Sequence, residues 1–263
     1  MNSFLTVRAF GSLDLDHAAT IASLPASLRV VGAGQADIAT TTPDLRSITA
    51  ALAVSPKGLV VTQPALLDDA AIGILGEAAV PVFPALALAP RLRLLDTGAT
   101  LASAGLVRSR LSWRGTIHEV LLEHLAGLEA VLGPISKVRI LASSDNGHIG
   151  TAQTQGGIVV NWSGRIDTGQ SDYELDIIGL SERLEVSGVL DGSARPLLVR
   201  HGTAGGLQQP HGIFETGLRC FWRAVVSDLT EGKAAPRWPD LSRLHALARE
   251  LAALSSVHGE DAA

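Results

Sequence analysis

The sequence predicts an α/β part followed by an α+β part. The first is a shortened parallel α/β domain over residues 1–95, and the second is an open, mainly antiparallel sheet with flanking helices over residues 96–254. In the first part, short apolar runs alternate with helix-like segments, which is typical of parallel βαβ units. In the second, several runs alternate apolar and polar residues between turn residues, which is typical of antiparallel strands. Residues 255–263 are predicted to form a flexible tail.

The first domain opens with a predicted strand over Leu5 to Phe10 that ends at Gly11. Asp14 or Asp16 is expected to cap the helix that follows, because a carboxylate accepts hydrogen bonds from the free amides of a first helical turn. The other predicted elements are, in order, a strand over 28–31, a helix over 45–54, a strand over 58–62, a helix over 68–78 and a strand over 80–83.

The second domain is organised around a long predicted helix over residues 117–132, which Gly133 and Pro134 end. A strand over 106–113 precedes it. The predicted strands that follow cover 137–141, 157–162, 171–178, 183–190 and 196–201, and two closing helices cover 214–229 and 240–254.

Composition limits the class of protein. The chain is 46% hydrophobic and has a net charge of −5 with no basic cluster, which argues against nucleic acid or an anionic membrane as the partner. No apolar run approaches the roughly 18 residues that a membrane-spanning helix needs. Cys220 is the single cysteine, which fits a reducing compartment. We therefore expect a cytoplasmic protein that takes a small-molecule ligand.

Four stretches of the chain resemble one family. They are an apolar strand ending in Thr62-Gln63-Pro64, a helix and strand over Leu121 to Val138, a hairpin over 158–178 centred on Trp162, and a C-terminal segment over 221–254. Together they resemble the Gfo/Idh/MocA oxidoreductases, NAD(P)-dependent enzymes that act mostly on sugars, polyols and related carbonyl compounds. The resemblance implies a Rossmann-like first domain and an open sheet that serves as a subunit interface. It thus implies a homo-oligomer, or a hetero-oligomer with an intact homologue.

The cofactor turn departs from the family pattern. The family's first strand leads into a glycine-rich turn that cradles a pyrophosphate, whereas residues 11–16 hold one glycine and two carboxylates. A second glycine pair, Gly32 and Gly34, lacks the third glycine of the fingerprint. If a nucleotide binds, the resemblance assigns it to Gly11, Ser12, Thr62 and Pro64; otherwise no cofactor is expected.

This chain also departs from the family pattern at the positions of the family's catalytic residues. The stretch matched to its Glu-Lys-Pro motif, residues 80–87, has no lysine, although that lysine positions and protonates the substrate oxygen in the family. Glu119 and Glu123 take the places of an acidic residue and a histidine at i and i+4. His124 comes one residue later, which rotates it about 100° around the helix, so it is expected to point elsewhere.

Glu119, Glu123 and His124 are therefore the candidate acid/base residues. The candidate substrate-binding residues are Trp113, Arg114, Trp162, Arg165 and His211. No metal site is expected, since one helix cannot aim His118, Glu119, Glu123 and His124 at one ion.

Three functional hypotheses follow. The first is an enzyme that has lost nicotinamide chemistry and works on a small polar metabolite as a lyase, cyclase, isomerase or hydrolase. The second is a non-catalytic partner subunit of an intact homologue. The third is an oxidoreductase that holds NAD or NADP on an atypical turn. The missing glycines and lysine favour the first hypothesis.

Overall fold

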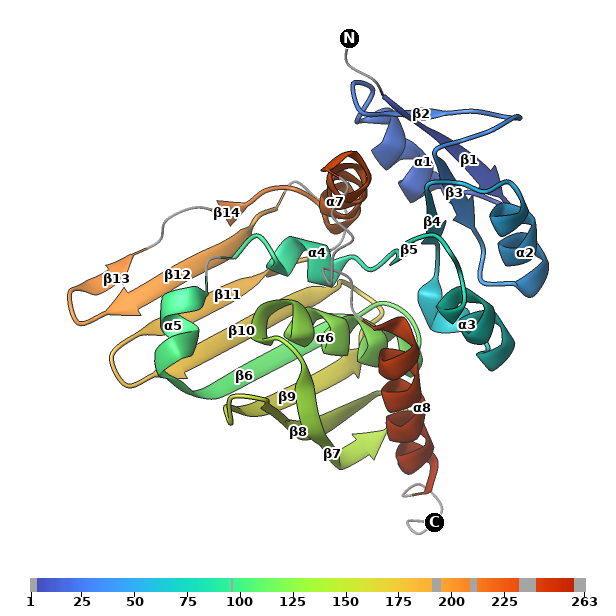
Figure 1. Cartoon of the computed structure of the whole chain (residues 1–263). Helices are drawn as coiled ribbons and strands as arrows, with labels where there is room; N and C mark the ends of the chain where they lie inside the picture. The colour runs from blue at the N-terminus through green and yellow to red at the C-terminus, as the bar shows by residue number, and fades with distance from the viewer. Residues whose placement is uncertain (1–3, 96, 191–194, 209–211, 232–239, 258–263) are drawn as a thin grey trace. The chain divides into compact units, whose positions relative to one another are not determined.

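The computed structural model of the chain describes residues 4–95, 97–190, 195–208, 212–231 and 240–257 (Figure 1). The chain divides into two compact units. The first combines Met1–Ala87 with Leu218–Arg243, and the second combines Leu88–Gly217 with Leu244–Ala263. This division falls after Ala87, whereas the sequence predicts a boundary after residue 95, and a late segment of the chain belongs to the first unit. The last helix continues to Val257, into the stretch expected to be a tail, and residues 258–263 lie outside the described part.

The first unit contains a five-stranded parallel sheet, as the alternation of strands and helices predicts. Its order is β2-β1-β3-β4-β5. The strands are β1 (Leu5–Phe10), β2 (Leu28–Val30), β3 (Ile38–Thr41), β4 (Gly58–Val61) and β5 (Val82–Pro84). The helices are α1 (Leu15–Ala22), α2 (Leu45–Ala53), α3 (Asp69–Gly76) and α7 (Gly217–Glu231), with a short 3₁₀ helix, η1 (Pro64–Leu66).

Strand β3 has no counterpart among the predicted elements. All four of its residues are buried, so it lacks the alternation of a half-exposed strand, and its two threonines weaken the apolar signal. No helix separates it from β2 in the structure, because residues 31–37 lead directly from β2 across β1 to β3.

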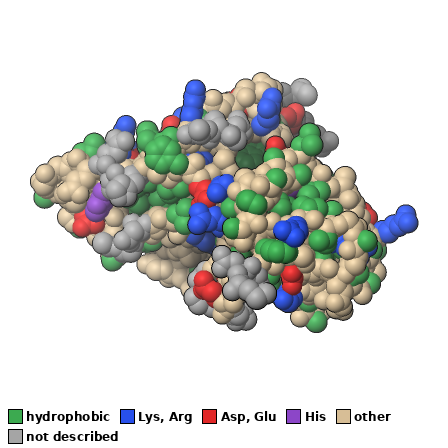
Figure 2. Space-filling view, turned by 90° about the horizontal axis from the view of Figure 1, so that it is seen from above, with side chains coloured by type: hydrophobic (Ala, Val, Ile, Leu, Met, Phe, Trp, Pro, Cys, Tyr) green, Lys and Arg blue, Asp and Glu red, His purple; other side chains and the backbone are tan. Residues whose placement is uncertain are grey.

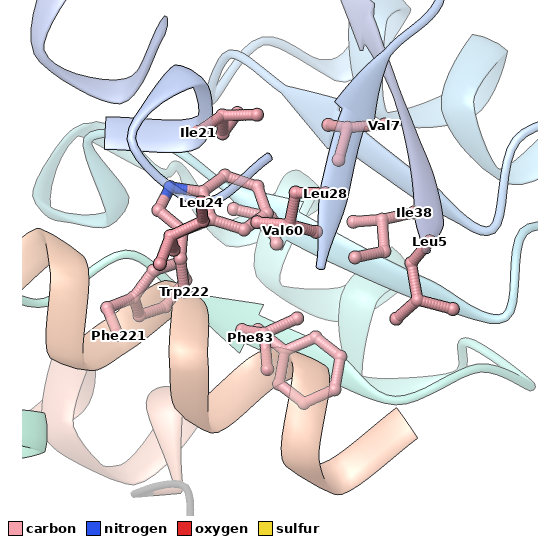
Figure 3. Packing of buried hydrophobic residues seen from close by; sticks show 11 residues of the cluster. Leu5, Val7, Ile21, Leu24, Leu28, Ile38, Val60, Phe83, Phe221 and Trp222 are labelled. Carbon is pink, nitrogen blue, oxygen red and sulfur yellow. The ribbon is translucent and has the colours of Figure 1, made fainter. Parts of the chain in front are cut away.

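Both faces of the parallel sheet are covered, as parallel sheets require. On one face, Ile21 and Leu24 pack with Val7, Ile38 and Val60, and the α7 residues Phe221, Trp222 and Val225 complete the cluster (Figure 3). On the other face, α2 and α3 bury Ile48, Ala51, Ala71, Ile72 and Leu75 against β3 and β4. A hydrogen bond from Trp222 Nε1 to His17 Nδ1, 3.2 Å long, joins α7 to α1.

The second unit contains the open sheet that the sequence predicts. It has nine strands in the order β13-β12-β11-β10-β6-β9-β8-β7, with β14 paired to β12. Strand β6 runs parallel to β9, and the other strand pairs of this sheet in the described residues are antiparallel. Its strands are β6 (Ala104–Trp113), β7 (Ile135–Ser144), β8 (Gly147–Thr154), β9 (Val159–Ile166), β10 (Asp172–Gly179), β11 (Arg183–Val189), β12 (Leu197–Thr203), β13 (Gly206–Gln208) and β14 (Gly212–Ile213).

Helices cover one face of this sheet. The long helix α6 (Ile117–Leu132) lies across it and contacts β6, β7 and β9 (Figure 1). It has the bounds that the sequence predicts, and it packs against the short helix α4 (Leu88–Leu92). The unit also contains α5 (Gly98–Ser103) and most of α8 (Leu241–Val257). None of the helices in the described part combines the length and hydropathy needed to cross a bilayer.

A polar cluster is buried between α6 and the sheet. His124 Nε2 lies 2.7 Å from Ser109 Oγ, which in turn donates to the Tyr173 hydroxyl at 3.1 Å. The His148 ring lies 4.6 Å from Trp162 and 6.4 Å from His124 between centroids. Gly164 leaves room for this ring, because a Cβ there would collide with His148. Within the described residues, neither His148 nitrogen has a hydrogen-bond partner.

Burial disfavours the charged form of both histidines. It lowers the pKa of His148 to about 4 and holds the pKa of His124 well below its ordinary value, where the neighbouring His148 also lowers it. The groups that face the two rings from β6, β9 and β10 are Ser109, Trp162 and Tyr173, which supply no carboxylate.

The cluster predicts an acid-sensitive second unit. Both pKa values are depressed in the folded state, so the unfolded chain binds these protons first and stability falls as the pH drops from about 6.5 towards 4. For His148 alone the loss is about 3 kcal/mol across this range. We expect His148→Leu to flatten the dependence of the urea unfolding midpoint on pH by about one proton. An unchanged slope in this variant would contradict the assignment.

Candidate functional site

The candidate site is the edge of the first unit where the parallel strands end. The chain leaves β1 towards β2 on one side, while β3 lies on the other side of β1. In open α/β sheets, ligands bind outside the carboxyl ends of the strands at this point of reversal. The segments that follow β1, β3 and β4 therefore form the site: residues 11–14, 42–44 and 62–64.

Gly11 turns the chain out of β1 at the centre of this edge. Its φ of +100° lies in the region that favours glycine. A Cβ at this position would lie 2.5 Å from Thr42 Oγ1, so the turns after β1 and β3 also pack closely. A larger residue fits neither the backbone conformation nor the space, and Gly11 is therefore required by the fold of this edge.

Asp14 occupies the amino end of α1. Its Oδ1 accepts a hydrogen bond from the His17 amide at 2.8 Å, so Asp14, one of the two N-cap residues expected from the sequence, caps this helix. The His17 ring behind it is buried, which lowers its pKa, although Asp14 and Asp16 act in the opposite direction. The amides that cradle a pyrophosphate in a dinucleotide site thus face a carboxylate of the chain itself. Gly11, which has no side chain, would let a nucleotide approach the backbone of this turn closely. The Asp14 carboxylate would repel the phosphates of that nucleotide.

The turn after β3 repeats this arrangement. Thr42 Oγ1 donates to Asp44 Oδ2 at 2.6 Å, and Asp44 Oδ1 accepts the Ser47 amide at 2.9 Å to cap α2. These hydrogen bonds lower the pKa of Asp44 to about 2, the Thr42 hydroxyl contributing most. The carboxylate therefore stays charged throughout the neutral range.

The segment after β4 contains a residue that sequence reasoning did not single out. Thr62 is buried and bonds Thr41 O through both its amide and its hydroxyl, and Pro64 is buried at the start of η1. Between them, Gln63 is exposed and adopts a left-handed conformation with φ 51° and ψ 52°. A positive φ at a residue other than glycine or asparagine is uncommon and marks a constrained position. Sequence alone gives no signal for it, because it depends on the packing of Thr62 and Pro64 on either side.

The residues assigned to a nucleotide by resemblance thus lie at this edge, although their side chains differ in exposure. Gly11 and Ser12 are exposed in the turn after β1, whereas Thr62 and Pro64 are buried at the end of β4. Of the four, Gly11 and Ser12 can meet a ligand directly.

The three candidate acid/base residues lie in the second unit, and each is engaged with a different partner. Glu119 forms a capping box with Thr116, accepting its amide and hydroxyl at 2.6 and 3.1 Å. Glu123 is buried and accepts the Leu88 amide at 3.0 Å. His124 is fully buried and paired with Ser109. Helix capping and core packing thus account for the contacts described at the three residues.

The candidate substrate residues are also dispersed. Trp162 is buried in the sheet core against His124 and His148. Arg165 donates to Ser112 Oγ at 2.8 Å and pairs with Asp167 at 3.0 Å. Trp113 is half-buried at the end of β6, and the neighbouring Arg114 is exposed. His211 lies outside the described residues.

Comparison with known proteins supports the fold through structure alone. No family model matches the sequence, and no curated protein matches it. Solved structures do match across nearly the whole chain. One is a variant of KijD10, a 3-ketoreductase from Actinomadura kijaniata, in complex with TDP-benzene and NADP, with 12% identity, a TM-score of 0.67, and 94% of this chain and 96% of that chain covered.

Two further matches are similar in extent. UDP-N-acetylglucosamine 3-dehydrogenase GnnA from Acidithiobacillus ferrooxidans has 11% identity and a TM-score of 0.68, with 94% of this chain and 96% of that chain covered. A candidate NADPH-dependent oxidoreductase from Desulfitobacterium hafniense has 12% identity and a TM-score of 0.72, with 99% and 97% covered.

These matches correct the functional hypothesis that the sequence favours. An enzyme of the lyase, cyclase, isomerase or hydrolase type is the wrong expectation, because the structural neighbours named here are oxidoreductases. A Rossmann-like parallel sheet joined to an open, mainly antiparallel sheet is confirmed. The chain shares its two-domain fold with these oxidoreductases.

Proposed function

We propose that this chain is an NAD(P)-dependent oxidoreductase of the Gfo/Idh/MocA type that acts on a sugar-like or other carbonyl substrate. The proposal rests on the fold. The first unit has a parallel sheet whose strand order changes direction at β1, and the second unit has an open sheet. KijD10 and GnnA share this combination over 94% of the chain. One of those enzymes reduces a 3-keto group and the other is a dehydrogenase of a nucleotide sugar. A bound nicotinamide would supply or accept the hydride.

The strand β3 changes the match between this chain and the family motifs. With β3 counted, the family's strand ending in Thr-Pro corresponds to β3 followed by Thr42-Pro43, and its Glu-Lys-Pro motif falls on Thr62-Gln63-Pro64 rather than on residues 80–87. Gln63 then stands where the family has lysine. A glutamine amide can hydrogen-bond a substrate oxygen but cannot protonate it at neutral pH. Gln63 would therefore orient the substrate, and a donor other than Gln63 would supply the proton when the carbonyl is reduced.

No lysine of the described residues can replace it at this edge. Lys57 precedes β4 at the opposite edge, where it pairs with Asp37 at 2.8 Å. Lys137 lies on β7 of the second unit and donates to Gln153. Lys233 lies outside the described residues.

The Asp14 carboxylate lowers the free energy that a nucleotide gains on binding at this turn. Displacing an N-cap costs about 1 kcal/mol, and a carboxylate about 4 Å from a phosphate charge costs about 1–4 kcal/mol at surface dielectric values. A micromolar dinucleotide site is worth about 8 kcal/mol. The penalty therefore weakens binding but does not abolish it, and the site fits a nucleotide held with reduced affinity.

We expect NAD(H) or NADP(H), at a concentration far above its dissociation constant, to raise the melting temperature of the protein by several degrees. A ligand at a thousand times that constant adds about 4 kcal/mol of stability. Asp14→Ser keeps a helix cap and removes the charge, so it should bind the same nucleotide about tenfold more tightly. Thermal shift and calorimetry measure both effects.

The matched control is Asp240→Ser, since Asp240 caps the Arg243 amide at 3.0 Å away from the turn after β1. It should leave nucleotide affinity unchanged. If neither the natural chain nor Asp14→Ser binds any of the four nucleotides, the oxidoreductase proposal fails.

The open face of the nine-stranded sheet is the surface we propose for self-association. Its strands carry alternating charges in ion pairs, among them Arg110 with Glu174 at 2.6 Å and Arg183 with Asp176 at 2.8 Å. A shallow hollow of about 510 Å³ lies over these strands and includes Ile149, whose side chain is 54% exposed. Mixed charges around an exposed apolar residue suit a two-fold interface, in which one patch meets its own copy.

On the face of the molecule drawn in Figure 2, Lys and Arg side chains stand in several separate places.

We expect a dimer or larger assembly by light scattering at micromolar concentration. Ile149→Asp places an unpaired charge at the centre of the proposed interface and should shift the protein towards monomer. Leu94→Asp, at a residue 57% exposed outside the sheet, is the control and should leave the assembly intact. A natural chain that is already monomeric would contradict the interface.

A further inference from the structure

We propose that His17 and Trp222 are positioning residues for the turn after β1. Together they hold the Asp14 carboxylate at the amino end of α1 and keep the imidazole beside it uncharged, so that helix α7 sets the charge that a ligand meets at this turn. This inference rests on the proposed function only for the identity of the ligand, because the contacts that carry it all lie within the first unit.

His17 lies between α7 and the turn after β1. Its side chain is buried on the first turn of α1. Two rings of α7, Phe221 and Trp222, meet the imidazole edge-on, with centroids 6.3 and 6.0 Å away and planes 85° and 83° apart. The same two rings pack with Leu24 at the other end of α1 (Figure 3). Packing on this side therefore keeps the imidazole from turning over and exchanging its two nitrogens.

The hydrogen bond from Trp222 determines which imidazole nitrogen carries the proton. Trp222 Nε1 lies 3.2 Å from His17 Nδ1. An indole N–H can only donate, so Nδ1 must accept, and the neutral ring carries its hydrogen on Nε2. A protonated ring would also carry a hydrogen on Nδ1, which would face the indole N–H. Trp222 thus favours the uncharged imidazole.

Both oxygens of the Asp14 carboxylate are held by His17. Oδ1 accepts the His17 amide at 2.8 Å, and Oδ2 lies 3.9 Å from His17 Nε2. The second distance is longer than a hydrogen bond, so this contact is an electrostatic one between the ring N–H and the carboxylate. The carboxylate therefore stays at the first amides of α1, the position that a phosphate takes when it binds at a helix amino end.

The charged groups around His17 leave it neutral. Asp14 and Asp16, on the same helix, favour the protonated ring, but burial has the larger effect and lowers the pKa of His17. Arg219 of α7 donates to Ser23 O and Oγ at the far end of α1. The strand residues of the surrounding cluster are apolar. The imidazole therefore does not neutralise the Asp14 carboxylate at neutral pH.

Removing the indole N–H should release this constraint. In Trp222→Phe no donor faces His17 Nδ1, so the pKa of the ring should rise towards its ordinary value of about 6.5. The imidazolium would then offset the charge of the Asp14 carboxylate that faces a phosphate. Affinity for a nucleotide should consequently increase as the pH falls, and it should do so more in this variant than in the natural chain.

Nitrogen NMR of the full chain with labelled histidine tests the relay without any ligand, the His17 signal being identified by its loss in His17→Gln. We expect the natural His17 to carry its proton on Nε2 between about pH 8 and 6.5, and to take up a second proton at a higher pH in Trp222→Phe. Phe221→Leu is the matched control, since it removes a ring that packs on His17 without donating to it. A neutral His17 with its proton on Nδ1, or equal titration in the natural chain and Trp222→Phe, overturns the inference.

Calorimetry with NAD(H) and NADP(H) at about pH 6 and pH 8 tests the effect on a ligand. Trp222→Phe should bind several-fold more tightly at the lower pH, whereas the natural chain and Phe221→Leu should change less. Equal pH dependence in all three proteins, with a nucleotide bound, overturns the inference and leaves the oxidoreductase proposal standing. Absence of binding by all four nucleotides, in the natural chain and in Asp14→Ser, overturns the oxidoreductase proposal and the ligand named here, while the NMR titration still decides whether Trp222 controls His17.

Discussion

The parallel sheet of the first unit must be covered on both faces, and this requirement organises the rest of the chain. Buried strands such as β3 and β4 present apolar side chains to each side. Helices α2 and α3 cover one face, but on the other face α1 buries few residues of its own. Phe221 and Trp222 of α7 complete that face, and the hydrogen bond from Trp222 to His17 fixes the orientation of α1. The turn at Gly11, and with it the site, depends on this packing.

Local signals in the sequence predicted much of this architecture. Asp14 was one of two expected caps for α1, and α6 has the predicted bounds because its capping residue and its terminal glycine both lie in the sequence. Strand β3 escaped prediction because it is short, buried on both sides and rich in threonine. Strand β8 escaped because its glycines and polar residues hide the alternation that the fold imposes on it.

The site was less predictable than the fold. The single glycine after β1 and the missing lysine are properties of the sequence, and both could be recognised from it. The partners of Glu123 and His124 are Leu88 and Ser109, which tertiary packing alone brings to α6, so the sequence could not separate core residues from acid/base residues there. Gln63 was overlooked because its place depends on counting β3 among the strands. Because β3 was not predicted, the Glu-Lys-Pro motif of the family was matched to residues 80–87 instead of to Thr62-Gln63-Pro64.

The return of residues 218–243 to the first unit has a consequence for how the chain is made. A ribosome adds about 5–20 residues per second, so the segment of residues 88–217 separates the sheet from its covering helix by on the order of ten seconds. During that interval the apolar side chains that later meet Phe221 and Trp222 are exposed on the nascent chain. Such a surface attracts chaperones and other unfinished chains. The order of translation therefore leaves the sheet of the first 87 residues without its covering helix until residues 218–243 have been made.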